Sequence, residues 1–292
     1  MADEYDDIRV ETAAVLSDKV FRRLSEFVQD EVGIKMPPAK KTMLEARLQR
    51  RLRKLGISSF EKYSDYVFSP QGTESELIHM IDAVTTNKTD FFREPNHFNY
   101  LTQHALPTLI ESTGAGVSRK LVLWSAGCST GEEPYTLTMV LSEFAERAPG
   151  RRFSFTIIAT DISTKVLGIA KGAIYDEEKI QPVPMPLRKK YLLRSKDKSK
   201  QLVRIVPELR SAVIFRRLNF MDDDFGFRET MDIVFCRNVV IYFDKPTQER
   251  LLTKFAKYLN PGGYLFMGHS ETIGGLNVPF TQVAPTIYRV NK

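Results

Sequence analysis

The chain has 292 residues, of which 42% are hydrophobic, and its formal net charge of +6 with a pI near 9.1 favours an anionic partner. No apolar run approaches the roughly 18 residues of a membrane-spanning helix, and Cys128 and Cys236 form no C-x-x-C pattern, so we expect neither membrane insertion nor a disulfide framework or zinc site. We also expect no nucleic-acid partner, because acidic residues are abundant and neither a recognition helix nor zinc-finger spacing is visible.

Helical spacing of apolar residues characterises the first part of the chain, after an acidic tail predicted over residues 1–16. The tail is unlike a secretory signal, so we expect a cytoplasmic protein. Apolar residues then recur at helical spacing: Val20, Leu24, Phe27 and Val28, and later Leu44, Leu48, Leu52 and Leu55. Turns are predicted at Pro37-Pro38, at Gly56 and over residues 69–72. We therefore expect a helical N-terminal domain over residues 17–90, followed by a linker and helix over 91–117.

The predicted helix from about Lys41 to Leu55 has an unusual charge pattern. It carries a single acid, Glu45, and six basic residues: Lys41, Arg47, Arg50, Arg51, Arg53 and Lys54. Such a face fits an electrostatic dock for an acidic partner, and it equally fits a basic surface that is only solvated.

Short apolar runs separated by helical stretches begin at Lys120 and predict a mostly parallel α/β sheet over residues 118–292. The runs are Leu121 to Trp124, Phe155 to Ala159, Val213 to Phe215, Ile233 to Cys236 and Tyr264 to Met267. The last segment, Phe280 to Val290, predicts a hairpin, so we expect an antiparallel edge on this sheet.

The β/α rhythm is interrupted by a subdomain that we place at about 178–212. Three prolines, Pro182, Pro184 and Pro186, precede a polar run over residues 195–200. The segments on either side of that run, Tyr191 to Leu193 and Leu202 to Val206, are predicted to pair as strands.

A strand, a small-residue turn and a helix are predicted over Leu121 to Pro134, where the turn contains Gly127 and Gly131. Glycines allow tight curvature and close approach of a ligand to the main chain, as in sites for nucleotide-like cofactors. Asp161 ends the next predicted strand, where a carboxylate can accept hydrogen bonds from ribose hydroxyls. The alternatives are a purely structural turn and a helix-capping role for Asp161.

The same turn fits the G-x-S-x-G nucleophile elbow of α/β hydrolases, with Ser129 as the nucleophile. Asp244 and His269 then satisfy the chain order of that triad. In that fold, however, several strands precede the elbow, whereas the sequence upstream of Leu121 predicts helices.

Two further groups of polar residues are candidates for a site: one precedes the α/β domain, and the other follows its later predicted strands. Residues 85–95 combine hydrogen-bonding side chains with two aromatics and Arg93, which fits both a lid over a cofactor and a linker. Asn219, Arg237, Asn238 and Tyr242 follow strands, where they can bind an adenine edge, a carboxylate or a reacting group. Capping and packing explain each of them equally well.

Together, four motifs closely resemble the CheR-type chemotaxis receptor glutamate methyltransferases. They are Thr-Thr-Asn-Lys-Thr-Asp-Phe-Phe-Arg-Glu at 85–94, Ser-Ala-Gly-Cys-Ser-Thr-Gly-Glu-Glu-Pro-Tyr at 125–135, Ala-Thr-Asp-Ile at 159–162 and Cys-Arg-Asn-Val-Val-Ile-Tyr-Phe at 236–243. The resemblance implies a Rossmann-like S-adenosylmethionine-dependent methyltransferase domain with an inserted antiparallel β-subdomain, preceded by a helical domain. It also implies Arg93 and Tyr242 as catalytic residues, no metal, and the following cofactor contacts: Asn87, Thr89, Arg93, Glu133, Asp161, Asn219, Phe220, Arg237 and Asn238.

The reaction that this family implies is methyl transfer to glutamate carboxylates on chemoreceptor cytoplasmic helices, giving methyl esters and S-adenosylhomocysteine. No general base is needed, since a glutamate with a pKa of about 4.3 is already ionised at neutral pH. The resemblance favours the docking interpretation for Arg47, Arg50, Arg51 and Lys54, and we expect a monomer. Some relatives also bind a receptor C-terminal peptide through the β-subdomain, which the lysine-rich 195–200 loop neither supports nor opposes. The remaining alternatives are a non-catalytic cofactor-sensing module that binds receptors and a hydrolase that uses Ser129.

Overall fold

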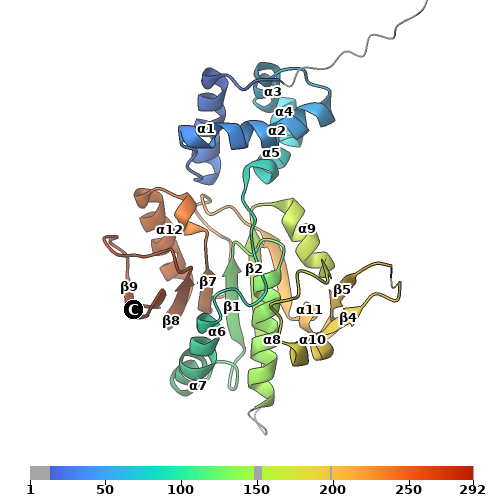
Figure 1. Cartoon of the computed structure of the whole chain (residues 1–292). Coiled ribbons are helices and arrows are strands. Elements are labelled where there is room, and N and C mark those ends of the chain that lie inside the picture. Colours follow the sequence, from blue (N-terminus) through green and yellow to red (C-terminus); the bar gives the residue numbers. More distant parts are fainter. Residues whose placement is uncertain (1–13, 148–152, 198, 292) are drawn as a thin grey trace, which may run out of the picture. The chain divides into compact units, whose positions relative to one another are not determined.

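The computed structural model describes residues 14–147, 153–197 and 199–291, so most of the predicted 1–16 tail lies outside the described residues (Figure 1). The contacts divide the chain into two compact units. The first, here called the helical unit, comprises the chain up to Asp30 together with Lys35–Val84. The second, the sheet unit, comprises Glu31–Ile34 and Thr85–Lys292.

The helical unit is built from short amphipathic helices. They are α1 (Asp18–Val32, whose last residues belong to the sheet unit), η1 (Pro38–Lys40), α2 (Lys41–Leu55), α3 (Phe60–Val67), α4 (Pro70–Ser75) and α5 (Leu77–Val84). The predicted turn at Gly56 ends α2 in the left-handed conformation that glycine adopts without strain. Ser59 and Ser69 cap α3 and α4 by accepting hydrogen bonds from backbone N–H groups.

A buried polar group lies inside the helical unit and involves the basic helix α2. Arg51 forms two hydrogen bonds with the carboxylate of Glu76, from Nε at 2.8 Å and from Nη2 at 2.5 Å. The Tyr63 hydroxyl donates to the same carboxylate at 2.9 Å. Glu76 is only 2% exposed, so its charge depends on Arg51 for compensation.

The sheet unit contains a seven-stranded sheet with the order β6-β2-β1-β7-β8-β10-β9. Its strands are β1 (Leu121–Ala126), β2 (Phe155–Asp161), β6 (Val213–Arg217), β7 (Met231–Cys236), β8 (Leu259–Met267), β9 (Phe280–Ala284) and β10 (Ile287–Val290). The first five in the spatial order pair in parallel, whereas β10 pairs antiparallel with both β8 and β9. The predicted parallel sheet with an antiparallel edge is thereby confirmed.

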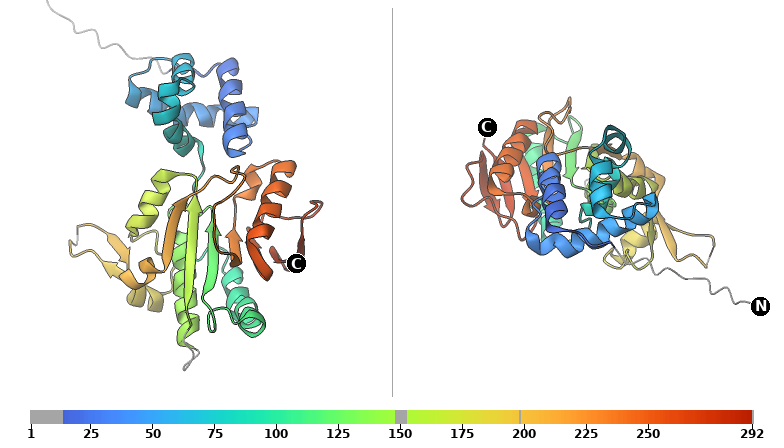
Figure 2. Two further views of the ribbon diagram at one scale, coloured as in Figure 1. Left: turned by 180° about the vertical axis from the view of Figure 1, so that it is seen from behind. Right: turned by 90° about the horizontal axis from the view of Figure 1, so that it is seen from above.

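Both faces of this sheet are covered, which explains the nearly continuous apolar sequence of its central strands. Alternate residues of β1 belong to two different hydrophobic clusters, with Leu121 and Leu123 in one and Val122 and Trp124 in the other. Figure 1 shows α8 in front of the sheet, and the view from behind in Figure 2 shows the strands in front of α8. The helices are α6 (Asn96–Tyr100), the π-helical η2 (Leu101–Ala105), α7 (Leu106–Thr113), α8 (Glu132–Glu146), α9 (Thr164–Gly172), α10 (Met185–Tyr191), α11 (Pro207–Ser211), η3 (Val240–Tyr242) and α12 (Lys245–Tyr258).

A small antiparallel sheet with the order β3-β5-β4 forms the predicted insertion. Its strands are β3 (Ile174–Asp176), β4 (Leu192–Arg194) and β5 (Leu202–Ile205). The predicted pairing of the two segments that flank the polar loop is confirmed by β4 and β5. The sheet also includes β3, which begins at Ile174, shortly before the expected bounds, and pairs with β5.

Two further observations concern the exclusions made from composition. Within the described part of the chain, no helix is both long and apolar enough to cross a membrane. Cys128 and Cys236 are both free and buried, and burial raises the pKa of each thiol.

Candidate functional site

The candidate site lies at the carboxyl edge of the large sheet, where β1 has β2 on one side and β7 on the other. The chain order reverses at β1, and open α/β sheets bind ligands outside the strand ends at such a switch point. Three predicted motifs follow these strands: the glycine turn after Ala126, Asp161 at the end of β2, and Arg237 with Asn238 after Cys236. The topology therefore gathers them along one edge.

The glycine turn is shaped by close approaches that exclude side chains. Gly127 and Gly131 have φ angles of 82° and 96°. A Cβ atom on Gly127 would lie 2.5 Å from Cγ2 of Val239, and one on Gly131 would lie 2.9 Å from Cβ of Ala170. The N–H groups of Gly127 and Cys128 both donate to the Thr160 carbonyl at 2.8 Å, which ties the turn to β2. Both glycines are thus required by geometry.

Asp161 lies beneath this turn and is 8% exposed. Its carboxylate accepts hydrogen bonds from the N–H of Ser129 at 2.8 Å and from the N–H of Ser163 at 2.9 Å. The N-cap of α9 is Ser163, whose hydroxyl accepts a hydrogen bond from the N–H of Val166. These two bonds tie the glycine turn and the start of α9 to the end of β2.

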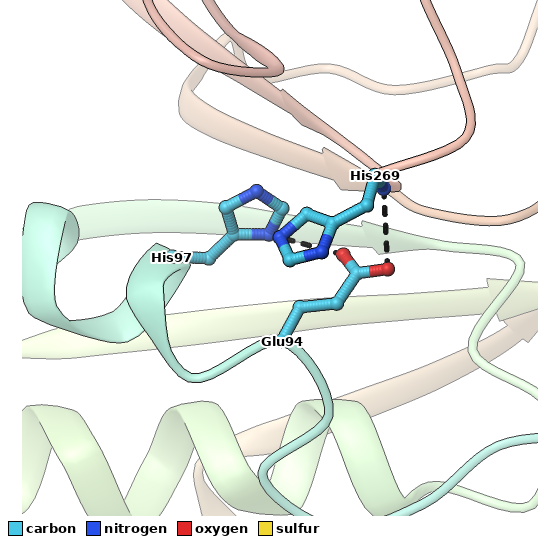
Figure 3. Close-up of side chains that lie close together, drawn as sticks. All are labelled: Glu94, His97 and His269. Carbon is cyan, nitrogen blue, oxygen red and sulfur yellow. Dashed lines mark hydrogen bonds and ion pairs between the residues drawn. The ribbon is translucent and has the colours of Figure 1, made fainter.

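Each residue of the alternative hydrolase triad has another role. The Ser129 hydroxyl donates to the Asn87 carbonyl at 2.8 Å, which joins the glycine turn to the 85–95 segment. Asp244 caps α12 by accepting a hydrogen bond from Thr247. His269 follows β8 and lies beside Glu94 and His97 (Figure 3). The hydrolase alternative is not favoured by these contacts.

Arg237 is buried, at 7% exposure, and lies at the centre of an internal network. Its Nε donates to Glu133 at 2.7 Å, and its Nη1 donates to the backbone carbonyl of Arg93 at 2.6 Å. Its guanidinium lies over the rings of Phe98 and Phe235, at 5.3 and 5.7 Å from their centroids. The other Glu133 oxygen accepts from Ser125 at 2.7 Å. Arg237 and Glu133 therefore compensate each other's charge inside the protein.

Glu94, His97 and His269 form a cluster whose candidate ligand atoms all lie within 4.8 Å of one another (Figure 3). Arg237 Nη1 lies 3.3 Å from Nδ1 of His97 and 3.6 Å from the Glu94 carboxylate, so a cation already occupies this environment. Nε2 of His97 is hydrogen-bonded to the Thr286 hydroxyl at 2.9 Å. Burial and the charge of Arg237 lower the pKa of His97 to about 4, so His97 is neutral at physiological pH. The guanidinium opposes metal binding here.

Backbone strain is concentrated at this edge. Among the described non-glycine residues with positive φ, four belong to the candidate motifs: Phe92 (54°), Glu94 (57°), Ser129 (48°) and Asn238 (60°). Phe92 and Glu94 flank Arg93, so the chain is bent on both sides of that residue. Strained conformations persist where surrounding contacts enforce them, and they are common at functional sites.

A buried acid that the sequence analysis missed holds the turn after β7. Glu271 is 4% exposed and accepts hydrogen bonds from the N–H groups of Asn238, Val239, Ile241 and Gly268, at 2.6 to 3.2 Å. Burial raises its pKa, and these N–H groups oppose that shift. The only sign of Glu271 in the sequence is an acidic residue shortly after a predicted strand. Acidic residues are so common at such positions that this one could not be singled out.

The other predicted site residues lie around these turns. Arg93 is half-buried and its Nη1 donates to the Lys88 carbonyl at 3.2 Å, while Asn87 donates to Thr85. Thr89 and Tyr242 are half-buried, in the 85–95 segment and in η3. The Asn219 side chain accepts from the N–H of Met221 at 3.0 Å. Phe220 packs edge-on against Trp124 and Phe255.

The predicted docking residues on α2 divide into two groups. Arg51 is hydrogen-bonded to Glu76 inside the unit, and Arg47 donates to the Val84 carbonyl at 2.6 Å. Arg50 and Lys54 are exposed, as is Arg53 between them. Arg50, Arg53 and Lys54 therefore present guanidinium and ammonium groups on the surface of the helical unit.

Comparison with known proteins identifies the family. A model described as the CheR methyltransferase SAM binding domain matches residues 87–289, and one described as the CheR methyltransferase all-alpha domain matches residues 19–85. The chain belongs to the CheR methyltransferase family. It is an S-adenosylmethionine-dependent methyltransferase of the chemotaxis type, which confirms the resemblance seen in the motifs.

Three relatives match over nearly their full length. The chemotaxis protein methyltransferase of Borreliella burgdorferi is 40% identical, with 92% of this chain and 93% of that protein covered. The Escherichia coli protein of the same name is 38% identical, with 95% and 92% covered. The probable chemotaxis protein methyltransferase of Rhizobium etli is 34% identical, with 90% and 96% covered.

Proposed function

We propose that this methyltransferase esterifies glutamate side chains on the cytoplasmic helices of chemoreceptors, acting in the cytoplasm as a monomer. The observation that supports this proposal most directly is the convergence of Asp161, the glycine turn, Asn238 and the Arg93 segment at one sheet edge. S-adenosylmethionine supplies an electrophilic methyl group when it is bound. The residues around it must then hold a carboxylate in line and exclude water.

The cofactor site that we assign comprises the residues that the family resemblance implied, with Glu133 and Arg237 in supporting rather than contacting positions: Asn87, Thr89, Arg93, Glu133, Asp161, Asn219, Phe220, Arg237 and Asn238. Two observations support the fit. Asn238 Oδ1 is buried and has no hydrogen-bond partner in the described part of the chain, and such an acceptor suits a ligand ammonium group. Asp161 presents a carboxylate at the end of β2, where such a group can accept hydrogen bonds from ribose hydroxyls. Glu133 and Arg237 contribute as a neutralised pair that fixes the surrounding backbone.

Arg93 and Tyr242 are our candidates for orienting the incoming carboxylate. A glutamate is ionised at neutral pH, so neither residue has to remove a proton. An arginine presents a planar fork that matches a carboxylate, and a phenol adds one further donor. Arg237 fixes the backbone at Arg93, because it donates a hydrogen bond to the Arg93 carbonyl and leaves the Arg93 side chain unbound by this contact. We therefore assign Arg237 a positioning role toward Arg93.

The decisive experiment is incubation of the enzyme with methyl-labelled S-adenosylmethionine and candidate receptor cytoplasmic domains. Label should appear on glutamate and should be released by mild base, as expected for an ester. Label on lysine or arginine would refute glutamate specificity. Cofactor binding in equilibrium dialysis without any transfer would favour the sensing module instead.

We also propose two receptor contacts. The first is an electrostatic contact between acidic receptor helices and the exposed residues Arg50, Arg53 and Lys54 of α2. The second is addition of a receptor C-terminal peptide to the small sheet, whose edge strand β4 exposes Leu193 at 51%. Calorimetric titration with such a peptide tests the second contact, and a heat signal that survives Leu193→Glu would contradict this location.

A further inference from the structure

A crevice of about 480 Å³ lies in the sheet unit beside β6 and is separate from the candidate site residues. We call it the β6 crevice. Its apolar wall comes from Tyr135 of α8, Pro207 of α11, and Val213 and Phe215 of β6. Its polar lining consists of Lys171, Arg210 and Ser211. None of the described residues that line it is acidic.

Arg210 is held in this crevice without a counter-charge. Its Nε atom is buried and finds no hydrogen-bond partner among the residues that the structure describes. Lys171 is exposed, and neither residue forms an ion pair within the described part of the chain. A buried guanidinium N–H that has left water without finding an acceptor costs free energy. A phosphate bound in the crevice would compensate the charge of this guanidinium.

The wall of the crevice offers apolar surface but no negative charge. Tyr135 is 1% exposed, and its hydroxyl is already engaged as a donor to the Ala170 carbonyl at 2.9 Å. Burial raises the pKa of Tyr135 to about 12, although the charge of Arg210 opposes this shift. Tyr135 therefore remains a neutral phenol and does not compensate Arg210.

We propose that the β6 crevice is a second ligand site, which binds a small phosphate monoester with a planar apolar body. A phosphate dianion matches the two cations, and guanidinium groups recognise phosphate oxygens through paired N–H donors. The Ser211 hydroxyl lies on the same lining but already donates to the Glu208 carbonyl at 2.8 Å, so recognition of the phosphate falls to the two cations. The apolar body would lie against Val213 and Phe215, as in other small-molecule sites that combine apolar walls with a few polar groups.

Phenyl phosphate is the probe, and isothermal titration calorimetry on the full chain is the measurement. S-adenosylhomocysteine is kept saturating, so that the cofactor site does not take up the probe. Phenyl phosphate should bind saturably with a Kd on the order of a millimolar, as suits so small a ligand. Benzoate, which carries one charge, should bind more weakly, and neutral phenol more weakly still. Equal affinity for benzoate and phenyl phosphate would overturn the match to a dianion.

Variants locate the site. Arg210→Gln should weaken phenyl phosphate binding about ten-fold or more, because it removes a charged hydrogen-bond donor. Lys171→Gln, at an exposed position that tolerates substitution, should weaken it several-fold. Arg228→Gln, an exposed arginine outside the crevice, is the matched control and should leave the Kd unchanged. Binding that is absent in the wild type, or that is unaffected by both crevice variants, would overturn the proposal.

Discussion

At the scale of single residues, the structure gives several motif residues roles that their types alone do not reveal. Arg237 suits a ligand carboxylate by its chemistry, yet its partners are Glu133 and the carbonyl of Arg93. Arg51 has the charge of a docking residue, yet it is bound to Glu76. In both cases the decisive partner lies far away in the sequence, so residue type and local spacing could not predict the contact.

Substituting Arg237 tests whether it positions Arg93. Arg237→Lys keeps the charge but lacks the planar fork that reaches Glu133 and Arg93 together. We expect kcat to fall by about ten-fold or more while the Kd for S-adenosylhomocysteine changes by less than about three-fold. Steady-state kinetics and calorimetry provide these values. Arg228→Lys, at an exposed position, is the control. A loss confined to cofactor affinity would instead favour direct cofactor binding by Arg237.

His97 makes stability depend on pH. Its pKa is lowered to about 4 in the folded protein from about 6.5, so the unfolded chain binds more protons between these values. The free energy of unfolding should therefore decrease as the pH falls from about 6.5 to 4, by on the order of 2 to 3 kcal/mol from this group.

Urea unfolding at several pH values measures this dependence. His97→Gln should flatten the curve between pH 6.5 and 4, because glutamine does not titrate there. His104→Gln changes an exposed histidine and should leave the slope as it is. If the free energy of unfolding depended on pH in the same way in the His97 variant and the wild type, groups other than His97 would be responsible for that dependence.

Among the helices and strands, the pattern of apolar residues and prolines within short segments predicted most of the secondary structure of the sheet unit. The apolar runs predicted the parallel strands, and the proline-rich interruption predicted a separate small sheet. The three-residue strand β3 was missed, because Ile174–Asp176 is too short to show alternation and forms only by pairing with β5. Similarly, the positive φ angles around Arg93 depend on contacts made elsewhere and leave no local signature.

Helix α2 is the element whose proposed role is easiest to test. Arg50→Glu with Lys54→Glu reverses two exposed charges and spares the buried Arg51–Glu76 pair. We expect the rate of receptor methylation at low receptor concentration to fall several-fold, while the Kd for S-adenosylhomocysteine is unchanged. Lys19→Glu with Arg22→Glu, a charge-matched change on α1, is the control. An equal fall in methylation rate in both variants would show that the net charge of the enzyme, and not the surface of α2, governs receptor binding.

At the scale of the whole molecule, the order of the motifs along the chain was more predictive than any single motif. A helical segment, a glycine turn between strand and helix, a strand-end acid and a later Arg-Asn pair together indicated the methyltransferase family. The parallel sheet then explains why residues separated by more than a hundred positions meet, since all strand ends share one edge. Side-chain partners across that edge could not be predicted, because they depend on packing in three dimensions.

The positive net charge predicts a salt dependence that belongs to the molecule as a whole. With a formal charge of +6, the enzyme should be attracted to acidic receptor helices over distances comparable to the Debye length. Raising the ionic strength from about 0.05 to 0.2 M should therefore increase the KM for the receptor several-fold. The Kd for S-adenosylhomocysteine, measured in the same buffers, should change much less. A KM insensitive to salt would contradict electrostatic recruitment.

The bond from Arg237 to residue 93 ends on the peptide oxygen, so it is indifferent to which side chain that residue carries. A glycine or alanine at position 93 would keep the same anchor and the same loop path. Such a variant would lack the guanidinium group of Arg93 while the backbone of this loop kept its conformation. Free guanidine or methylguanidine in the buffer could then restore turnover, and chemical complementation of this kind would isolate what the side chain itself contributes.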